Sequence, residues 1–220
     1  PWAERMAHVN FGRVHGMSTR KGNIVLLTDV LDEAKSRALE KVRENAKVGR
    51  IQTNDPEALA EQIGLGAVVF GDLKNRRVSD YTFDWDDVLS FDGHTGPYVQ
   101  YAHARACTIL AKAGGLPSSY DAARLELPEE QAVVRAVAKF PEEVAAAVAE
   151  DEPSLVARHL LEMSTLFSRW YTTGNQDRAK RVLTEDDSGA RAARVVLTDA
   201  VRVTLAAGLK LLGVPTPEAM

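Results

Sequence analysis

The sequence contains a single cysteine, Cys107, in 220 residues, so it cannot hold an internal disulfide bond. This absence favours a reducing, cytoplasmic setting. No uninterrupted apolar run approaches the roughly 20 residues that a membrane-spanning helix needs. The first residues, PWAERMAH, lack the basic and then apolar layout of a signal peptide. We therefore expect neither a secreted nor a membrane-spanning protein, and, because residue 1 is Pro rather than Met, we expect a piece of a longer chain.

Common ligand-binding patterns are missing as well. The sequence has no P-loop of the form G-x-x-x-x-G-K-[ST] and no G-x-G-x-x-G. No set of His, Cys or carboxylate residues has the spacing of metal ligands, so we expect no metal site.

Acidic and basic residues are unevenly distributed along the chain, whose net charge is −4. Residues 11–50 carry nine Lys and Arg against five Asp and Glu, and residues 154–183 carry five against two. Between them, residues 116–153 carry three basic and nine acidic residues. The two basic regions could bind a polyanion while the whole chain stays acidic, or they could be ordinary solvated helix faces.

The first part of the chain has a mixed pattern. Short apolar stretches predict strands at Val9 to Val14 and at Ile24 to Leu27, with a loop between them. Asp29 is placed to cap a helix that follows. A second helix is predicted from Asp55 as the cap and Pro56 as the first residue to a stop at Gly64, followed by LGAVVFGDL, which favours a helix over a strand. After an extended stretch, a short helix is predicted after Trp85.

From about residue 95 onward the pattern is almost entirely helical. Short loops between amphipathic helices predict an antiparallel bundle. Proline and glycine residues, and a serine cap, mark the expected ends of the helices, which are Pro97 to Gly114, Pro128 to Lys139, Pro141 to Glu150, Pro153 to Gly174 and Ser188 to Gly213. We place the boundary between a mixed part, 1–95, and a helical part, 96–220.

The stretch GMSTRKGN, residues 16–23, combines hydroxyl, cationic and glycine residues in one loop. Ser18 and Thr19 offer hydroxyl donors, and Arg20 and Lys21 offer two positive charges. Cations and donors of this kind stabilise charge that builds on phosphates during phosphoryl or adenylyl transfer. The same residues could equally form a solvated turn.

The segment HVNFGRVHGMSTRKGNIVLLTDVLDEA resembles the second signature region of class I aminoacyl-tRNA synthetases, in the form found in arginyl-tRNA synthetases. Against the class pattern Lys-Met-Ser-Lys-Ser, Met17 and Ser18 match. Gly16 stands for the first Lys, Thr19 for the second Lys and Arg20 for the final Ser. The stretch TGPYVQYAHAR and the ending GLKLLGVPTPEAM are also similar to that family, so the resemblance covers nearly the whole chain.

The resemblance implies a mainly α fold, with a small α/β remnant of the class I catalytic domain followed by an all-α anticodon-binding helical bundle. It implies that Met17, Ser18, Thr19, Arg20 and Lys21 face the phosphates of ATP, with Mg²⁺, in an intact arginine–tRNA ligase. The His-x-Gly-His motif that binds the adenine side of ATP in class I enzymes is absent from this sequence. We therefore expect these 220 residues to form the C-terminal part of the enzyme and to be inactive alone.

Candidate tRNA contacts lie in the helical part. Aromatic rings can stack on nucleotide bases, and cationic side chains can contact phosphates. The candidates on the helix that begins at Pro97 are Tyr98, Gln100, Tyr101 and Arg105, and those near residue 175 are Tyr171, Arg178 and Lys180. The two tyrosines of the first group could instead pack the domain junction, and Arg105 could pair with an internal carboxylate.

Three hypotheses follow. The first is the C-terminal part of an arginine–tRNA ligase, whose partners are arginine-specific tRNA, arginine and ATP, with neither membrane nor DNA. The second is a free-standing, non-catalytic homologue that binds tRNA. The third is an interaction scaffold whose loop binds nothing.

Overall fold

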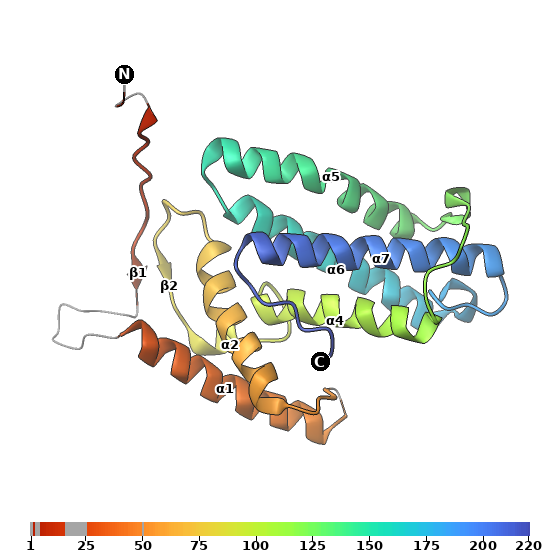
Figure 1. Ribbon diagram of the computed structural model, residues 1–220, viewed down its shortest axis with the longest axis horizontal. Coiled ribbons are helices and arrows are strands. Elements are labelled where there is room, and N and C mark those ends of the chain that lie inside the picture. The colour runs from red at the N-terminus through yellow and green to blue at the C-terminus, as the bar shows by residue number, and fades with distance from the viewer. Residues whose placement is uncertain (1, 3–4, 16–25, 50) are drawn as a thin grey trace.

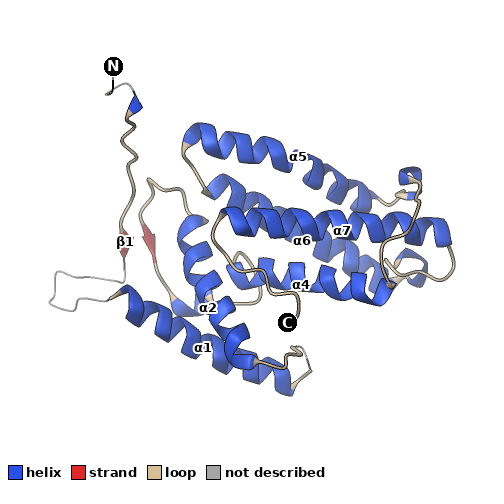
Figure 2. Ribbon diagram, viewed as in Figure 1, coloured by secondary structure: helices blue, strands red, loops and turns tan. Residues whose placement is uncertain are grey.

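Helices form nearly all of the regular structure in the computed structural model, which describes residue 2 and residues 5–15, 26–49 and 51–220 (Figures 1 and 2). The mainly helical fold expected from the sequence is confirmed. The described helices are α1 (Leu27–Lys47), α2 (Pro56–Leu73), α3 (Trp85–Val88), α4 (Gly96–Ala113), α5 (Pro128–Glu150), α6 (Ser154–Gln176) and α7 (Ser188–Leu211), with 3₁₀ turns η3 (Ala122–Arg124) and η4 (Arg178–Lys180).

The four long helices α4, α5, α6 and α7 form the bundle, and α1 and α2 form a hairpin beside it (Figure 1). The bundle encloses the larger apolar core, in which Trp170, Phe167 and Met163 of α6 are fully buried. A smaller core fills the space between α1, α2 and α3, with Val42 and Ile63 at its centre. α2 packs on both α1 and α4, so it joins the hairpin to the bundle.

The strands are shorter than the sequence predicts. β1 (Val14–His15) pairs in parallel with β2 (Tyr81–Thr82), with Val14 opposite Tyr81. The predicted strand at Val9 to Val14 is therefore reduced to its last residue. Of the second predicted strand, Leu27 belongs to α1 and Ile24 lies outside the described residues.

Several predicted helix ends are confirmed. The Asp55 side chain accepts a hydrogen bond from the N–H of Ala58 at 2.9 Å and so caps α2, with Pro56 as its first residue. Gly114 ends α4 in the left-handed conformation that suits glycine. LGAVVFGDL is helical, and the short helix at Trp85 is present.

Other helix ends differ from the predictions. Leu26, not Asp29, is the N-cap of α1, and Asp29 lies in the first turn, where a carboxylate favours the helix dipole. α5 continues through Pro141 as one helix, and α7 is capped by Asp187 rather than Ser188. Gly64 and Gly174 lie inside α2 and α6 instead of ending them.

The C-terminal segment folds back along α4 (Figure 1). The amide Nε2 of Gln100 donates to the carbonyl of Pro215 at 2.9 Å, and Nδ1 of His103 lies 3.0 Å from the carbonyl of Pro217. Met220 packs against the smaller core. The end of the chain is thereby fixed between the hairpin and the bundle.

No helix in the described part of the chain is both long and apolar enough to cross a membrane.

Candidate functional site

A cation lies between two aromatic rings where α4 meets α6. The guanidinium carbon of Arg105 lies 4.5 Å from the centroid of the Tyr101 ring, one turn earlier on α4. The same carbon lies 4.8 Å from the centroid of the Tyr171 ring on α6. Cation–π contacts of this kind attract the guanidinium to both rings and so favour this arrangement. The structure thus brings together three of the residues that the sequence singled out.

Two neighbouring hollows share residues of this cluster in their lining. One, of about 370 Å³, lies between α4, α6 and the segment 181–183, and the other, of about 460 Å³, lies toward the α1–α2 turn and the C-terminus. Arg105, Thr108, Lys112 and Tyr171 line both. We name the two hollows together the Arg105 groove. Its other lining residues are Gly49, Gln52, Tyr101, Ile109, Gly174, Asn175, Arg181, Val182, Leu183, Ala219 and Met220.

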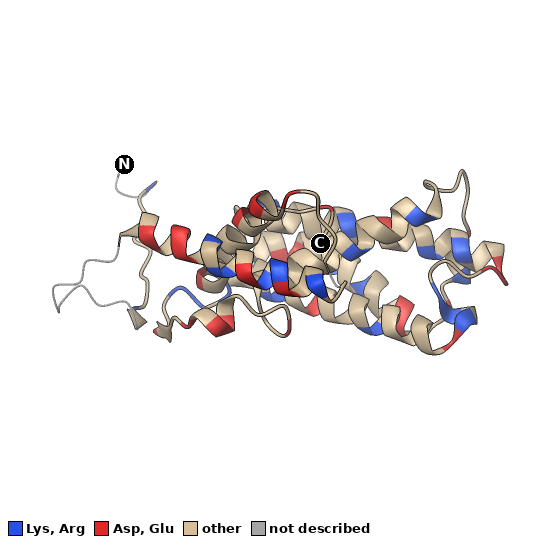
Figure 3. Ribbon diagram, turned by 90° about the horizontal axis from the view of Figure 1, so that it is seen from below, with Lys and Arg blue, Asp and Glu red and all other residues tan. Residues whose placement is uncertain are grey.

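The Arg105 groove combines positive charge with aromatic surface. Arg105, Lys112 and Arg181 contribute cations, and no Asp or Glu side chain is among its described lining residues. Elsewhere on the molecule, Lys and Arg are interspersed with Asp and Glu along the helices (Figure 3). A groove that is lined by cations and by half-buried tyrosine rings suits a nucleotide, whose base can stack and whose phosphate is anionic.

Sequence reasoning missed several residues of the Arg105 groove. Lys112 lies two turns beyond Arg105 on α4, so helical spacing alone could have added it. Gln52 and Met220 come from two other parts of the chain and carry no local signal. Arg181 was not missed, because it belongs to the same basic run as Arg178 and Lys180. Met220 reaches the groove because the C-terminal segment is held on α4 by Gln100 and His103.

Gln100 cannot contact an RNA from its position in the fold. It is fully buried, and its Nε2 donates to the carbonyls of Gln62 and Pro215 at 3.1 and 2.9 Å. Tyr98 is half-buried against the main core, and its hydroxyl lies 3.4 Å from the Oγ of Ser168. The structure therefore places these two predicted contacts at the internal junction, the alternative left open for Tyr98.

Arg178 and Lys180 lie on η4, outside the Arg105 groove. Arg178 pairs with Glu185 at 2.5 Å, and Lys180 with Asp177 at 3.3 Å. All four side chains are at least 42% exposed. Exposed ion pairs contribute little energy and are screened by salt, so both cations can leave these carboxylates to contact a phosphate.

The five predicted ATP-facing residues, Met17 to Lys21, lie outside the described residues. The chain just before them is held to β2. The N–H of Arg13 donates to Asp80 at 2.8 Å, and Nε2 of His15 lies 3.3 Å from the same carboxylate. The hydrogen bond from Arg13 makes the larger contribution and that from His15 the next, and together they hold the pKa of the Asp80 carboxyl below its ordinary value.

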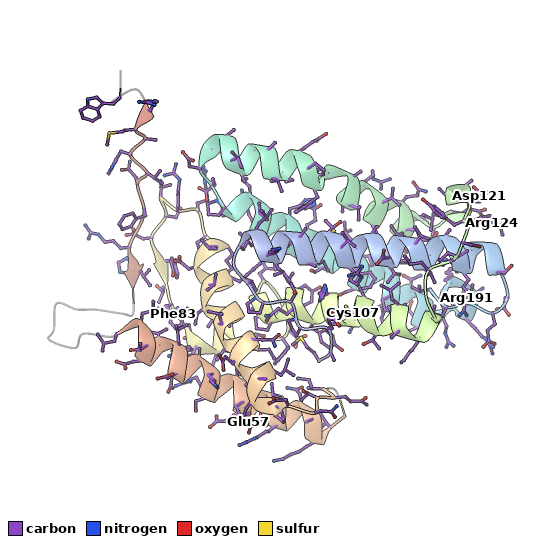
Figure 4. The ribbon with its side chains drawn as sticks, viewed as in Figure 1. Glu57, Phe83, Cys107, Asp121, Arg124 and Arg191 are labelled. Carbon is purple, nitrogen blue, oxygen red and sulfur yellow. The ribbon has the colours of Figure 1, made fainter. Side chains whose placement is uncertain are left out.

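The single thiol lies away from the Arg105 groove. Cys107 lies on α4 near the C-terminal segment (Figure 4), and its Sγ is 3.8 Å from Nε2 of His103. Burial raises the pKa of the Cys107 thiol, which favours the protonated form. Cys107 is half-buried. Among the described residues, no group of three or more His, Cys, Asp or Glu side chains could hold a metal ion.

Two protein-family models match the chain. Residues 99–220 match the DALR anticodon binding domain, and residues 1–85 match the class I tRNA synthetase (R) catalytic domain. The arginine–tRNA ligase of Ligilactobacillus salivarius is 40% identical over 223 residues, and that of Alkaliphilus metalliredigens is 36% identical over 224. Each alignment covers 100% of this chain but only 38% of the relative's length.

Solved structures agree with these matches. Thermus thermophilus arginyl-tRNA synthetase superposes with a TM-score of 0.85 at 36% identity, over 94% of this chain and 34% of that one. The Plasmodium falciparum enzyme has a TM-score of 0.76 at 23% identity, over 97% of this chain and 35% of the other, which supports the shared fold.

Proposed function

Since the chain belongs to the DALR anticodon-binding family and joins that domain to the end of a class I arginyl-tRNA synthetase catalytic domain, we propose that it is the C-terminal part of an arginine–tRNA ligase. The intact enzyme would use ATP to activate arginine and would then esterify the 3′ end of its tRNA. The chain spans 38% of the length of the curated relatives described above, so these activities belong to the proposed longer protein. We assign 1–95 to the catalytic domain and 96–220 to the tRNA-binding bundle, and we expect a cytoplasmic enzyme.

The Arg105 groove is the observation that carries the tRNA-binding role. Tyr101 and Tyr171 both contact the Arg105 guanidinium, which restrains each ring before any ligand binds. Bases of an anticodon loop are splayed out of a helix and can stack on aromatic rings. Lys112 and Arg181 lie within the same groove and can neutralise phosphates. Tyr101, Arg105 and Tyr171 are thus the proposed base-contacting residues, and Arg178 and Lys180 are peripheral phosphate contacts.

The signature loop is the proposed contribution of 1–95 to catalysis. When ATP and Mg²⁺ are bound, they supply the activated phosphate and the metal that shields its charge. The donor set of the loop suits that group, because Ser18 and Thr19 can donate hydrogen bonds and Arg20 and Lys21 can meet the charge that builds on the phosphates.

Two other functions remain to be separated from this one. A free-standing, non-catalytic homologue would bind tRNA through the same groove and would have no ligase activity. A scaffold protein would bind no tRNA. The contacts of Arg105 favour the first two over the third, because a guanidinium held between two rings at the edge of a cationic groove is suited to a nucleotide.

The test is binding of tRNA to the 220-residue chain, measured by fluorescence anisotropy at several salt concentrations. Because the chain is acidic overall, we expect weak to moderate affinity that falls steeply with salt, as local phosphate contacts release counterions. We also expect a preference for arginine tRNA over a non-cognate tRNA. Equal affinity for both at every salt concentration would reject anticodon reading, and no binding at low salt would favour the scaffold.

A further inference from the structure

A buried ion pair joins α5 to α7 behind the Arg105 groove. Nε of Arg194 lies 2.6 Å from Oε1 of Glu130, and the two side chains are 7% and 0% exposed. Replacing a buried pair by apolar residues is often neutral or even stabilising. Stability alone therefore does not explain why Glu130 and Arg194 occupy these positions. Their other hydrogen bonds explain it better.

The remaining hydrogen bonds of the pair go to the backbone. Nη1 of Arg194 donates to the carbonyls of Ala179 and Arg181, at 2.7 and 3.0 Å. Oε2 of Glu130 accepts from the N–H of Leu127 at 2.9 Å, at the start of α5. Glu130 is thereby fixed to its own helix end, and it fixes the guanidinium that reaches from α7 to the segment containing η4.

That segment forms one wall of the Arg105 groove. Arg181, Val182 and Leu183 line the groove directly after η4. The backbone of Arg181 lies against the end of α6, since a Cβ built on Gly174 would come within 3.0 Å of its Cα, and Nε of Arg181 donates to the carbonyl of Gly174 at 3.3 Å. The two carbonyls held by Arg194 thus set the position of the Arg181 side chain relative to Tyr171.

We propose that Glu130 and Arg194 are positioning residues for RNA binding. They fix the backbone at Ala179 and Arg181 so that the Arg181 cation faces the Arg105 groove, and neither residue lines the groove itself. This inference rests on the proposed binding of tRNA. Glu130→Gln keeps the shape of the side chain and removes its charge. Arg194→Lys keeps the charge, but a single ammonium group cannot reproduce the planar fork that bonds three acceptors on two elements.

Limited proteolysis with trypsin tests, in the absence of RNA, whether the segment containing η4 stays in place. It cleaves after Arg178, Lys180 and Arg181, and cleavage requires the segment to leave its place on the bundle. We expect Glu130→Gln and Arg194→Lys to be cut there about tenfold faster than the unchanged chain, well below the unfolding temperature, because each loses a charge-assisted hydrogen bond that holds the segment. Arg202→Lys is the matched control, because Arg202 is also on α7 but bonds Asp199. Equal cleavage rates in both variants and the unchanged chain would overturn the proposal.

A double-mutant cycle then tests the link to RNA. If Glu130 acts through Arg181, then Glu130→Gln, Arg181→Ala and the double variant should weaken tRNA binding by similar amounts, and each should lower the salt slope by about 0.7 to 0.9. A merely structural role would lower Tm and leave the slope unchanged. If the unchanged chain binds no tRNA, the proposed function fails together with this role. If it binds and Glu130→Gln alters neither affinity nor slope, only the inference fails.

Discussion

The guanidinium of Arg105, on α4, lies 4.8 Å from the centre of the Tyr171 ring, on α6, although 66 positions separate the two residues in the sequence. The contact connects two helices of the bundle at the edge of an open groove. It also restrains the Tyr171 ring, so stacking of a base on that ring would require less reordering of the side chain.

Replacing Tyr171 by Ala should weaken binding of arginine tRNA by about 1 to 3 kcal/mol, because one base loses its stacking partner. Tyr120→Ala is a suitable control, since Tyr120 is 56% exposed and does not line the Arg105 groove. Anisotropy titrations of both variants measure the difference, at a temperature where unfolding curves show both to be folded, because Tyr171 also packs against the larger core. Equal affinities for the two variants would remove Tyr171 from the binding site.

Replacing Arg178 and Lys180 together by Ala should weaken all tRNAs alike and flatten the dependence of log K on log salt. Phosphate contacts carry no sequence information, and each one contributes about 0.7 to 0.9 to the slope. Lys139→Ala is the control, because Lys139 is exposed on α5 and pairs with Glu143. A selective loss of arginine tRNA would instead indicate that η4 contacts bases.

Features encoded by neighbouring residues could be predicted from the sequence. Asp55 followed by Pro56 marks the start of α2, and Gly114 marks the end of α4, because a cap and a left-handed turn depend on local chemistry. The helical spacing of Tyr101 and Arg105 likewise placed two members of the cation–aromatic cluster on one face.

Features that depend on tertiary packing could not be predicted in this way. The sequence predicts that Gly64 ends a helix. In the structure, a Cβ at this position would lie 2.8 Å from the backbone of Ala34, so the glycine allows α1 and α2 to approach closely. Pro141 reads as a break, but α5 tolerates it, because proline's φ is compatible with a helix and the cost is one lost hydrogen bond and a local clash. Met220 reaches the Arg105 groove through bonds that Gln100 makes to the C-terminal segment, which no local pattern encodes.

The stability of the chain should fall as the pH drops from about 7.5 to about 5.5, partly through His103. Burial lowers the pKa of His103, and the charge of Arg202 adds to this effect, whereas the bond to the Pro217 carbonyl and the charge of Glu218 oppose it. The unfolded chain therefore binds a proton near the ordinary histidine value of about 6.5, while the folded chain resists it. This contribution is complete above about pH 7.5 and is lost as the pH falls.

Urea unfolding of the unchanged chain and of His103→Gln at a series of pH values measures the contribution of His103. The variant should show a shallower loss of unfolding free energy on acidification, and exposed His94→Gln should behave like the unchanged chain. Identical pH slopes for all three would contradict this role of His103.

The isolated 220 residues should not form arginyl-adenylate. The His-x-Gly-His motif that binds the adenine side of ATP in class I enzymes is absent from the sequence. Pyrophosphate exchange into ATP, with and without arginine and tRNA, is the measurement. Arginine-dependent exchange by this chain alone would show that activation does not need that motif.

In the proposed full-length enzyme, replacing Arg20 and Lys21 by Ala should lower the rate of arginine activation by about 10² to 10³ and leave arginine binding nearly unchanged. The reason is that these cations would meet charge that develops on the phosphates only in the transition state, whereas arginine bears no phosphate and binds before that charge appears. Lys35→Ala is the control, because Lys35 is a cation on α1, the next helix along the chain, and pairs with Glu61 of α2. Pyrophosphate exchange at saturating arginine gives the rate, and equilibrium binding of arginine gives the affinity. An unchanged rate in the double variant would mean that Arg20 and Lys21 are surface charges, and an equal fall in rate and in arginine affinity would mean that they shape the amino-acid site instead.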